Sequence, residues 1–81
     1  MALSPAQAFA QAAREIRKEQ GLSQEQAALD SGIDRAYVGH IERATKTPTT
    51  TTIFKLADAL GVRPSAIFAR AEKLLERDSR T

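Results

Sequence analysis

The chain contains 81 residues, of which 42% are hydrophobic and 27% are charged, and its formal net charge is +2. This length predicts one domain, residues 1–81, and no Cys is present to form a disulfide or a thiolate metal site. No apolar stretch approaches the ~20 residues that span a bilayer, and the first residues lack the basic start of a signal peptide, so we expect a cytoplasmic protein without a membrane partner.

Two helices are predicted in the N-terminal part of the chain. The first spans about 5–20, because Ser4 is a favourable N-cap and Gly21 is a favourable C-terminal stop. The second spans about 24–31 and ends at Gly32. Two consecutive alanines in the second helix leave room for another helix to approach closely.

Three more helices are predicted in the C-terminal part. The third spans about 35–43, with Asp34 as its N-cap, and a loop rich in Thr and Pro at 45–52 follows it. The fourth spans about 52–60 and the fifth about 64–77. Apolar residues recur at three- and four-residue spacing, which predicts one buried stripe on each helix and no sheet. The stripes include Phe9, Ile16, Val38, Ile41, Ile53, Leu56, Leu60, Ile67 and Phe68.

The second and third helices form a candidate helix-turn-helix at about 23–43. Two short helices joined by a short turn that contains glycine can place the first over a phosphate backbone and the second in the major groove of DNA. The outward side of the third helix carries Arg35, Ala36, Gly39, His40 and Arg43. Because glycine inside a helix costs ~1 kcal/mol relative to alanine, Gly39 favours a close approach of DNA. The alternative is a glycine that is merely tolerated on a solvent-exposed face.

Several short segments together carry a resemblance to a known family. They are Leu22-Ser23-Gln24-Glu25, Gly32-Ile33-Asp34-Arg35, Tyr37, Ile41-Glu42-Arg43, Pro48-Thr49 and Leu56-Ala57-Asp58-Ala59-Leu60-Gly61-Val62. Residues 9–69 resemble the Cro/repressor-type helix-turn-helix of phage repressors and bacterial regulators, and are also similar to the controller proteins of restriction-modification systems. The resemblance implies an all-α, five-helix, lambda-repressor-like fold and a sequence-specific DNA-binding regulator of transcription, either a repressor or an activator.

The resemblance also implies roles for residues at the start of the candidate helix-turn-helix. Gln24 matches a position that touches a phosphate, and Tyr37 matches a position that contacts the DNA backbone. Arg35 is suited to a bidentate contact with guanine, which is worth about 1–3 kcal/mol of discrimination. Ala36 fits against a thymine methyl group, and His40 is left open between a base, a phosphate and solvent.

Further roles follow for the end of the third helix and its loop. Arg43, Lys46 and Thr47 match the phosphate-contacting loop of the family. Arg17 and Glu42 match an ion pair that ties the first helix to the third without touching DNA. The chain departs from the family at the next position, where Ala44 replaces the usual glycine. A left-handed turn there would cost alanine about 1 kcal/mol or more.

A dimer is expected, because one helix-turn-helix binds weakly and two can bridge half-sites about 34–36 Å apart on a near-palindromic operator. We expect Phe54, Leu74 and Leu75 to line the interface between two copies. The alternative is that Leu74 and Leu75 fold back on Phe9 of the first helix.

Catalysis is poorly supported by the residue types present. A single His, no Cys and no convergent carboxylates leave little for a catalytic pair or a metal, and we expect no cofactor and no small-molecule ligand. Glu25 and Asp30 could contact RNA polymerase if the protein is an activator, but the favoured interpretation is that both are solvated surface charges. The alternative function is a protein-interaction module, such as an antitoxin, with DNA binding as a secondary activity. An exposed Leu29 would support it.

Overall fold

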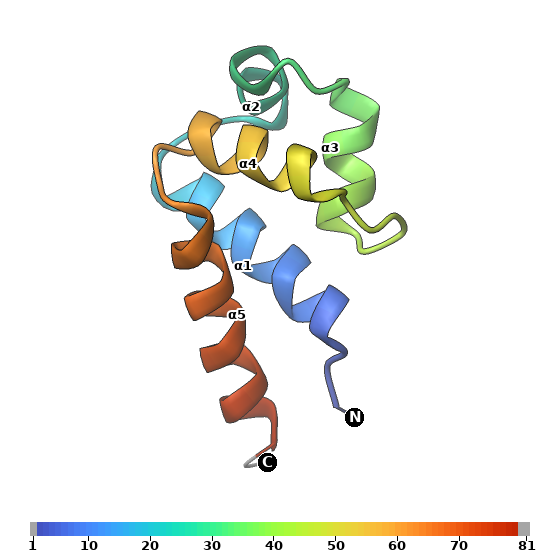
Figure 1. Cartoon of the computed structure of the whole chain (residues 1–81), viewed down its shortest axis with the longest axis vertical. Coiled ribbons are helices and arrows are strands. Elements are labelled where there is room, and N and C mark those ends of the chain that lie inside the picture. Colours follow the sequence, from blue (N-terminus) through green and yellow to red (C-terminus); the bar gives the residue numbers. More distant parts are fainter. Residues whose placement is uncertain (1, 80–81) are drawn as a thin grey trace.

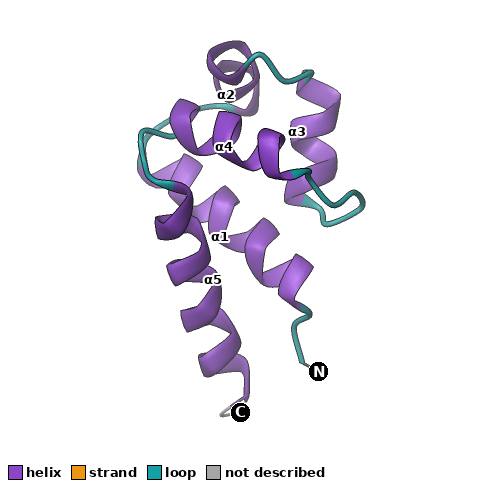
Figure 2. Ribbon diagram, in the orientation of Figure 1, coloured by secondary structure: helices purple, strands orange, loops and turns teal. Residues whose placement is uncertain are grey.

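The computed structural model describes residues 2–79. Within this range the chain forms five helices joined by short connections (Figures 1 and 2). They are α1 Pro5–Glu19, α2 Gln24–Ser31, α3 Arg35–Glu42, α4 Thr50–Ala59 and α5 Pro64–Ser79. No strand occurs within this range. The predicted all-α, five-helix class is therefore confirmed.

Side-chain caps decide where α1 and α4 begin. At α1, the Ser4 hydroxyl accepts from the backbone N–H of Gln7 at 3.1 Å, and the Gln7 side chain accepts from the N–H of Ser4 at 2.9 Å. At α4, the Thr49 hydroxyl accepts from the N–H of Thr52 at 3.2 Å. This cap starts α4 at Thr50, so the prediction that the loop extends to residue 52 is wrong.

Four helices end on a residue in the left-handed conformation, namely Gly21 and Gly32 with φ 72°, Ala44 with φ 57° and Gly61 with φ 71°. After α3, the N–H of Ala44 donates to the carbonyl of Ile41 and the N–H of Thr45 to the carbonyl of His40, both at 3.0 Å. These two bonds form the Schellman arrangement that closes many helices. The turn ends α3 at Glu42, one residue before the predicted end. Ala44 therefore adopts the geometry that glycine supplies at the three other ends.

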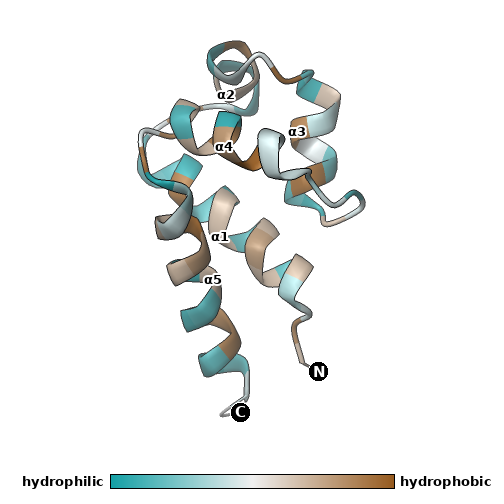
Figure 3. Ribbon diagram, viewed as in Figure 1, coloured by the Kyte–Doolittle hydropathy of each residue, from teal (hydrophilic) through white to brown (hydrophobic). Residues whose placement is uncertain are grey.

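The core lies between α1 and the helices α3, α4 and α5, with the apolar sides of the ribbons turned inward (Figure 3). Phe9 of α1 meets Phe68 of α5 with 5.2 Å between ring centroids. Leu74 is only 6% exposed and belongs to this core, while Leu75 is half-buried against it. Packing within one chain therefore uses Leu74, and the expectation that it lies in an interface between copies is wrong. Phe54 on α4 is 60% exposed.

A second link between α1 and α5 is ionic. The Arg70 guanidinium lies 3.1 Å from a carboxylate oxygen of Glu15 and 2.7 Å from one of Glu19. A hydrogen bond from Gln11, followed by the contact with Arg70, holds the pKa of Glu15 below its ordinary value. Arg70 is also the main cause that lowers the pKa of Glu19. Because these groups remain partly exposed to solvent, which screens their charges, they add little to stability beside the apolar contacts.

The left-handed alanine predicts a gain of stability on substitution. Ala44→Gly should raise the free energy of unfolding by about 0.5–1 kcal/mol, because glycine removes the steric cost of the left-handed conformation. The greater conformational entropy of glycine in the unfolded chain offsets part of this gain. Urea unfolding followed by circular dichroism measures the change. The matched control is Ala69→Gly inside α5, which should lower stability by about 1 kcal/mol. A loss of stability in Ala44→Gly would contradict the strain.

Candidate nucleic-acid interface

The turn between α2 and α3 is held by local hydrogen bonds. Gly32 is left-handed with φ 72° and ends α2. The Ser31 hydroxyl donates to the carbonyl of Ala28 and accepts from the N–H of Ile33, both at 3.2 Å. The side chain of Ile33 is half-buried against the core. The turn thus sends α3 along one edge of the molecule (Figure 1).

The two sides of α3 differ in the way that the sequence predicts. Val38 and Ile41 face the interior and are each 1% exposed. Arg35 and Ala36, at the N-terminal end, are exposed on the other side. Tyr37 is half-buried against the core, so only part of its ring faces solvent. One side of α3 is therefore buried in the interior, while Arg35 and Ala36 at its start are exposed to solvent.

Gly39 differs from its expected setting, because it is buried. The Arg43 side chain covers it, and a Cβ added at Gly39 would lie 3.0 Å from Nη1 of Arg43. The alternative of a glycine on a solvent-exposed face is therefore wrong, and the close approach of DNA at Gly39 stays a prediction. In the free chain the space beside Gly39 is filled by a guanidinium.

Arg17 of α1 and Glu42 of α3 form a bidentate ion pair. Arg17 Nε lies 2.6 Å from Glu42 Oε2, and Arg17 Nη2 lies 3.1 Å from Glu42 Oε1. Their side chains are 10% and 5% exposed. The remaining nitrogen, Nη1, donates to the carbonyl of Leu22 at 2.7 Å. A planar guanidinium with donors on every side suits this buried position.

Gln24 takes part in the same cluster. Its side-chain amide donates to Glu42 Oε1 at 3.0 Å, which joins the start of α2 to the end of α3. A side-chain amide has two N–H donors, so one stays available for a further acceptor such as a phosphate. Gln24 is half-buried, consistent with a side chain that has an inner and an outer partner.

His40 is half-buried and tied to the turn that follows α3. The Thr45 hydroxyl donates to the carbonyl of His40 at 3.1 Å, and His40 Nδ1 lies 2.9 Å from the same hydroxyl oxygen. Because the only hydroxyl proton goes to the carbonyl, Nδ1 is the donor in the second contact. In the neutral ring, Nε2 is then an acceptor. Sequence reasoning missed Thr45, although the Schellman turn brings positions 40 and 45 together.

Unpaired cations gather at the end of α3 and in its loop. Arg43, Lys46 and Thr47 are exposed, as is Arg35 at the other end of the helix. Within residues 2–79, the ion pairs involve Arg17 and Arg70, and none involves Arg35, Arg43 or Lys46. Free surface cations can neutralise phosphates and release counterions, which favours binding to a polyanion.

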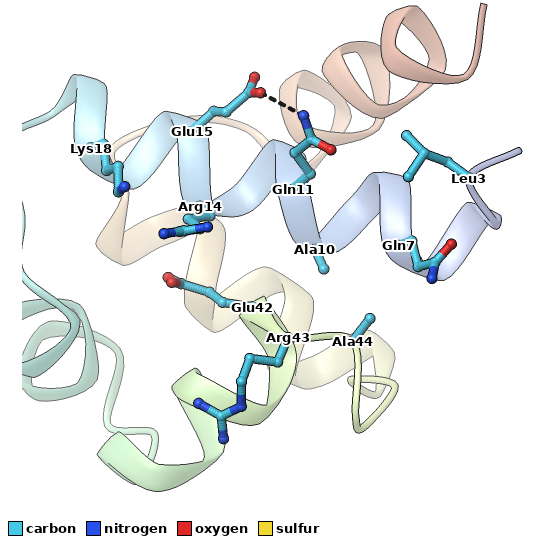
Figure 4. Close-up of a pocket in the computed structure, with 10 residues that line it drawn as sticks. All are labelled: Leu3, Gln7, Ala10, Gln11, Arg14, Glu15, Lys18, Glu42, Arg43 and Ala44. Carbon is cyan, nitrogen blue, oxygen red and sulfur yellow. Dashed lines mark hydrogen bonds between the residues drawn. The ribbon is translucent and has the colours of Figure 1, made fainter. Parts of the chain in front are cut away.

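A pocket of about 400 Å³ with a mixed polar and apolar lining extends this surface onto α1 (Figure 4). Arg14 and Lys18 line it on α1, across from Glu42 and Arg43. The sequence reasoning had not placed the two α1 cations beside the loop. Their four-residue spacing, which puts both on one face of α1, was the available signal.

Other site types lack support in this part of the chain. No group of three His, Asp or Glu side chains between residues 2 and 79 is arranged to hold a metal ion. Over the same residues, no helix has both the length and the apolar character needed to cross a membrane.

Comparison with known proteins gives a consistent picture. The helix-turn-helix family profile matches residues 14–67. The chain is 43% identical over 47 residues to the uncharacterized HTH-type transcriptional regulator y4dJ of Sinorhizobium fredii, a match that covers 58% of this chain and 61% of the regulator. It is 39% identical over 57 residues to the control protein C.BamHI of Bacillus amyloliquefaciens, which covers 69% of this chain and 70% of that protein. The chain thus spans less than two thirds of the length of y4dJ.

A solved structure also matches closely. The restriction-modification controller protein C.AhdI of Aeromonas hydrophila superposes with a TM-score of 0.75 at 44% identity, covering 76% of this chain and 94% of the controller. The resemblance drawn from the sequence is therefore confirmed for both the helix-turn-helix and the fold.

Removal of one partner of the buried ion pair should be costly. Glu42→Ala leaves the Arg17 charge buried without its carboxylate, and we expect it to lower the free energy of unfolding by about 3 kcal/mol or more. Urea unfolding measures this loss.

The control for that measurement is Glu72→Ala, an exposed carboxylate on α5 whose removal should change stability by less than about 0.5 kcal/mol. The double variant Arg17→Met, Glu42→Leu should be more stable than Glu42→Ala, because no charge then stays buried alone. An equal effect of Glu42→Ala and Glu72→Ala would show that the pair contributes nothing.

Proposed function

The chain belongs to the helix-turn-helix family, and on that premise we propose that it regulates transcription by binding a specific DNA operator through α3. One observation carries the proposal: Arg35 and Ala36 are exposed at the start of α3, while Val38 and Ile41 anchor the other side. An exposed guanidinium at this position can bond to O6 and N7 of guanine. A methyl group beside it fits the methyl group of thymine.

Binding would proceed from charge to sequence. Arg43, Lys46 and Thr47 lie on the exposed surface at the end of α3 and in its loop, where phosphates would first be attracted. Gln24 and Tyr37 would then position the backbone, and Arg35 would read a base. The regulator would act by occupying the operator in the cytoplasm and not by catalysis, and would either block RNA polymerase or recruit it.

We propose that two copies bind together on a near-palindromic site. Phe54 supports an interface on α4. Its side chain is 60% exposed, and covering that apolar surface with a second copy lowers the free energy of the pair. Leu75, half-buried on α5, can extend the same contact, whereas Leu74 is used inside the chain. The expected half-site spacing is about 34–36 Å, one turn of DNA.

Selection of bound sites from random DNA tests the operator proposal. The wild-type chain should enrich one near-palindromic sequence, and Arg35→Ala should bind that sequence with an affinity lower by about 1–3 kcal/mol for each half-site. Because Arg35 is exposed, circular dichroism should show an unchanged fold. Arg63→Ala, another exposed arginine, is the charge-matched control and should keep the sequence preference. Enrichment of no sequence by the wild type would refute the proposal.

Sedimentation equilibrium tests the dimer separately. The wild-type chain should sediment as a dimer at micromolar concentration, and Phe54→Asp should sediment as a monomer because a buried carboxylate opposes the contact. Leu29→Asp, at another exposed apolar position, is the control and should stay dimeric. A monomeric wild type would defeat this part of the proposal.

The alternative, a module that binds another protein, has one supporting observation. Leu29 on α2 is 77% exposed, beside a shallow depression that Ile33 also lines. A partner such as a toxin or RNA polymerase would cover this apolar surface. A stoichiometric protein that co-purifies with the wild type, and is lost in Leu29→Ser, would favour this function.

A further inference from the structure

Arg43 does not extend from the end of α3 into the loop. Its guanidinium lies back over the middle of α3, where the Cβ of any residue replacing Gly39 would be 3.0 Å from Nη1 and 3.6 Å from Cζ. Side chains on a helix lean toward its N-terminus, so a residue covers the surface about one turn before its own Cα. Gly39 stands one turn before Arg43. The absence of a side chain there provides the space in which the guanidinium lies.

No acidic group holds the guanidinium of Arg43 in this place. The adjacent carboxylate, Glu42, is engaged by Arg17 and Gln24. Among residues 2–79, no hydrogen bond or ion pair to the Arg43 side chain is formed. Its five N–H donors therefore remain available to a ligand on the outward side of α3.

The position along the helix matters for what Arg43 can reach. Residues 35, 39 and 43 are four apart and share one side of α3, so the Cα atoms of Arg35 and Arg43 are separated by about 12 Å along the axis. By folding back over Gly39, Arg43 brings its charge about 6 Å closer to the N-terminal half of the helix. That half is the part of a recognition helix that meets base edges.

We propose that Arg43, seated on Gly39, reads a guanine in the major groove as a second base-reading arginine beside Arg35. This inference rests on the proposed DNA-binding function, and it replaces the phosphate contact that the sequence resemblance implies for Arg43. Gly39 then has a defined purpose, although glycine weakens a helix. It is a positioning residue, and its effect on DNA passes through Arg43.

Selection from random DNA distinguishes a base contact from a phosphate contact. The wild type should prefer a G·C pair at two positions of each half-site, one for each arginine. Arg43→Ala should keep the preference at the Arg35 position and lose about 5- to 100-fold of the preference at the other. Gly39→Ala should weaken the preference at the same position, because a methyl group 3.0 Å from Nη1 forces the guanidinium to shift from its place over the helix. Both variants should fold, since Arg43 is exposed and alanine strengthens a helix.

Two comparisons complete the test. Gly39→Ala introduced into Arg43→Ala should cause no further change in preference, because the displaced group is already absent. Arg63→Ala, an exposed arginine between α4 and α5 that lies outside the candidate interface, is the charge-matched control and should leave the selected sequence unchanged.

Three results would overturn the inference while leaving the proposed function intact. The first is an unchanged selected sequence in Arg43→Ala with uniformly weaker binding and a salt dependence lower by about one charge, which marks a phosphate contact. The second is a preference lost in Arg43→Ala but kept in Gly39→Ala, which would remove the role of the glycine. The third is a further change of preference when Gly39→Ala is added to Arg43→Ala. Failure of the wild type to select any sequence would instead refute the proposed function itself.

Discussion

The position of α3 depends on a single buried carboxylate. Glu42 accepts from Arg17 of α1 with both oxygens and from Gln24 of α2 with one, so three helices meet at one side chain. Charges removed from water are tolerated only when such partners satisfy them, and the cost of losing one is high. This cluster ties the C-terminal end of α3 to α1 and α2, and the buried side chains of Val38 and Ile41 anchor the same helix to the interior. No group on the outward side of the helix is needed for that purpose.

This arrangement separates folding from recognition within eight residues. Val38 and Ile41 anchor α3 by apolar burial, and Glu42 anchors it by an ion pair. Arg35 and Ala36 are exposed and take no part in these contacts. In the proposed DNA-binding function, substitutions on the free side would therefore change the preferred DNA sequence at little cost to stability. Gly39 lies between the two groups, because it is covered by a side chain of its own helix and not by the core.

Much of the fold follows from local sequence signals. Ser4, Gly21 and Gly32 predict the ends of helices because the hydrogen-bonding needs of helix termini are local. The start of α4 was missed because consecutive threonines resemble a loop until Thr49 is recognised as the cap. Spacing shows that Leu74 is on an apolar stripe, but not whether α1 or a second copy covers it. The sequence also does not show that the Arg43 side chain covers Gly39, because the rotamer of Arg43 depends on three-dimensional packing.

The left-handed Ala44 has a consequence for the lifetime of the protein in a cell. The wild-type chain is expected to be up to about 1 kcal/mol less stable than Ala44→Gly. Its unfolded population is then larger by up to about fivefold. Proteases act on that population, so the strained junction shortens the residence of each molecule. In the proposed role as a regulator of transcription, faster turnover would let the concentration of the protein follow changes in synthesis with less delay.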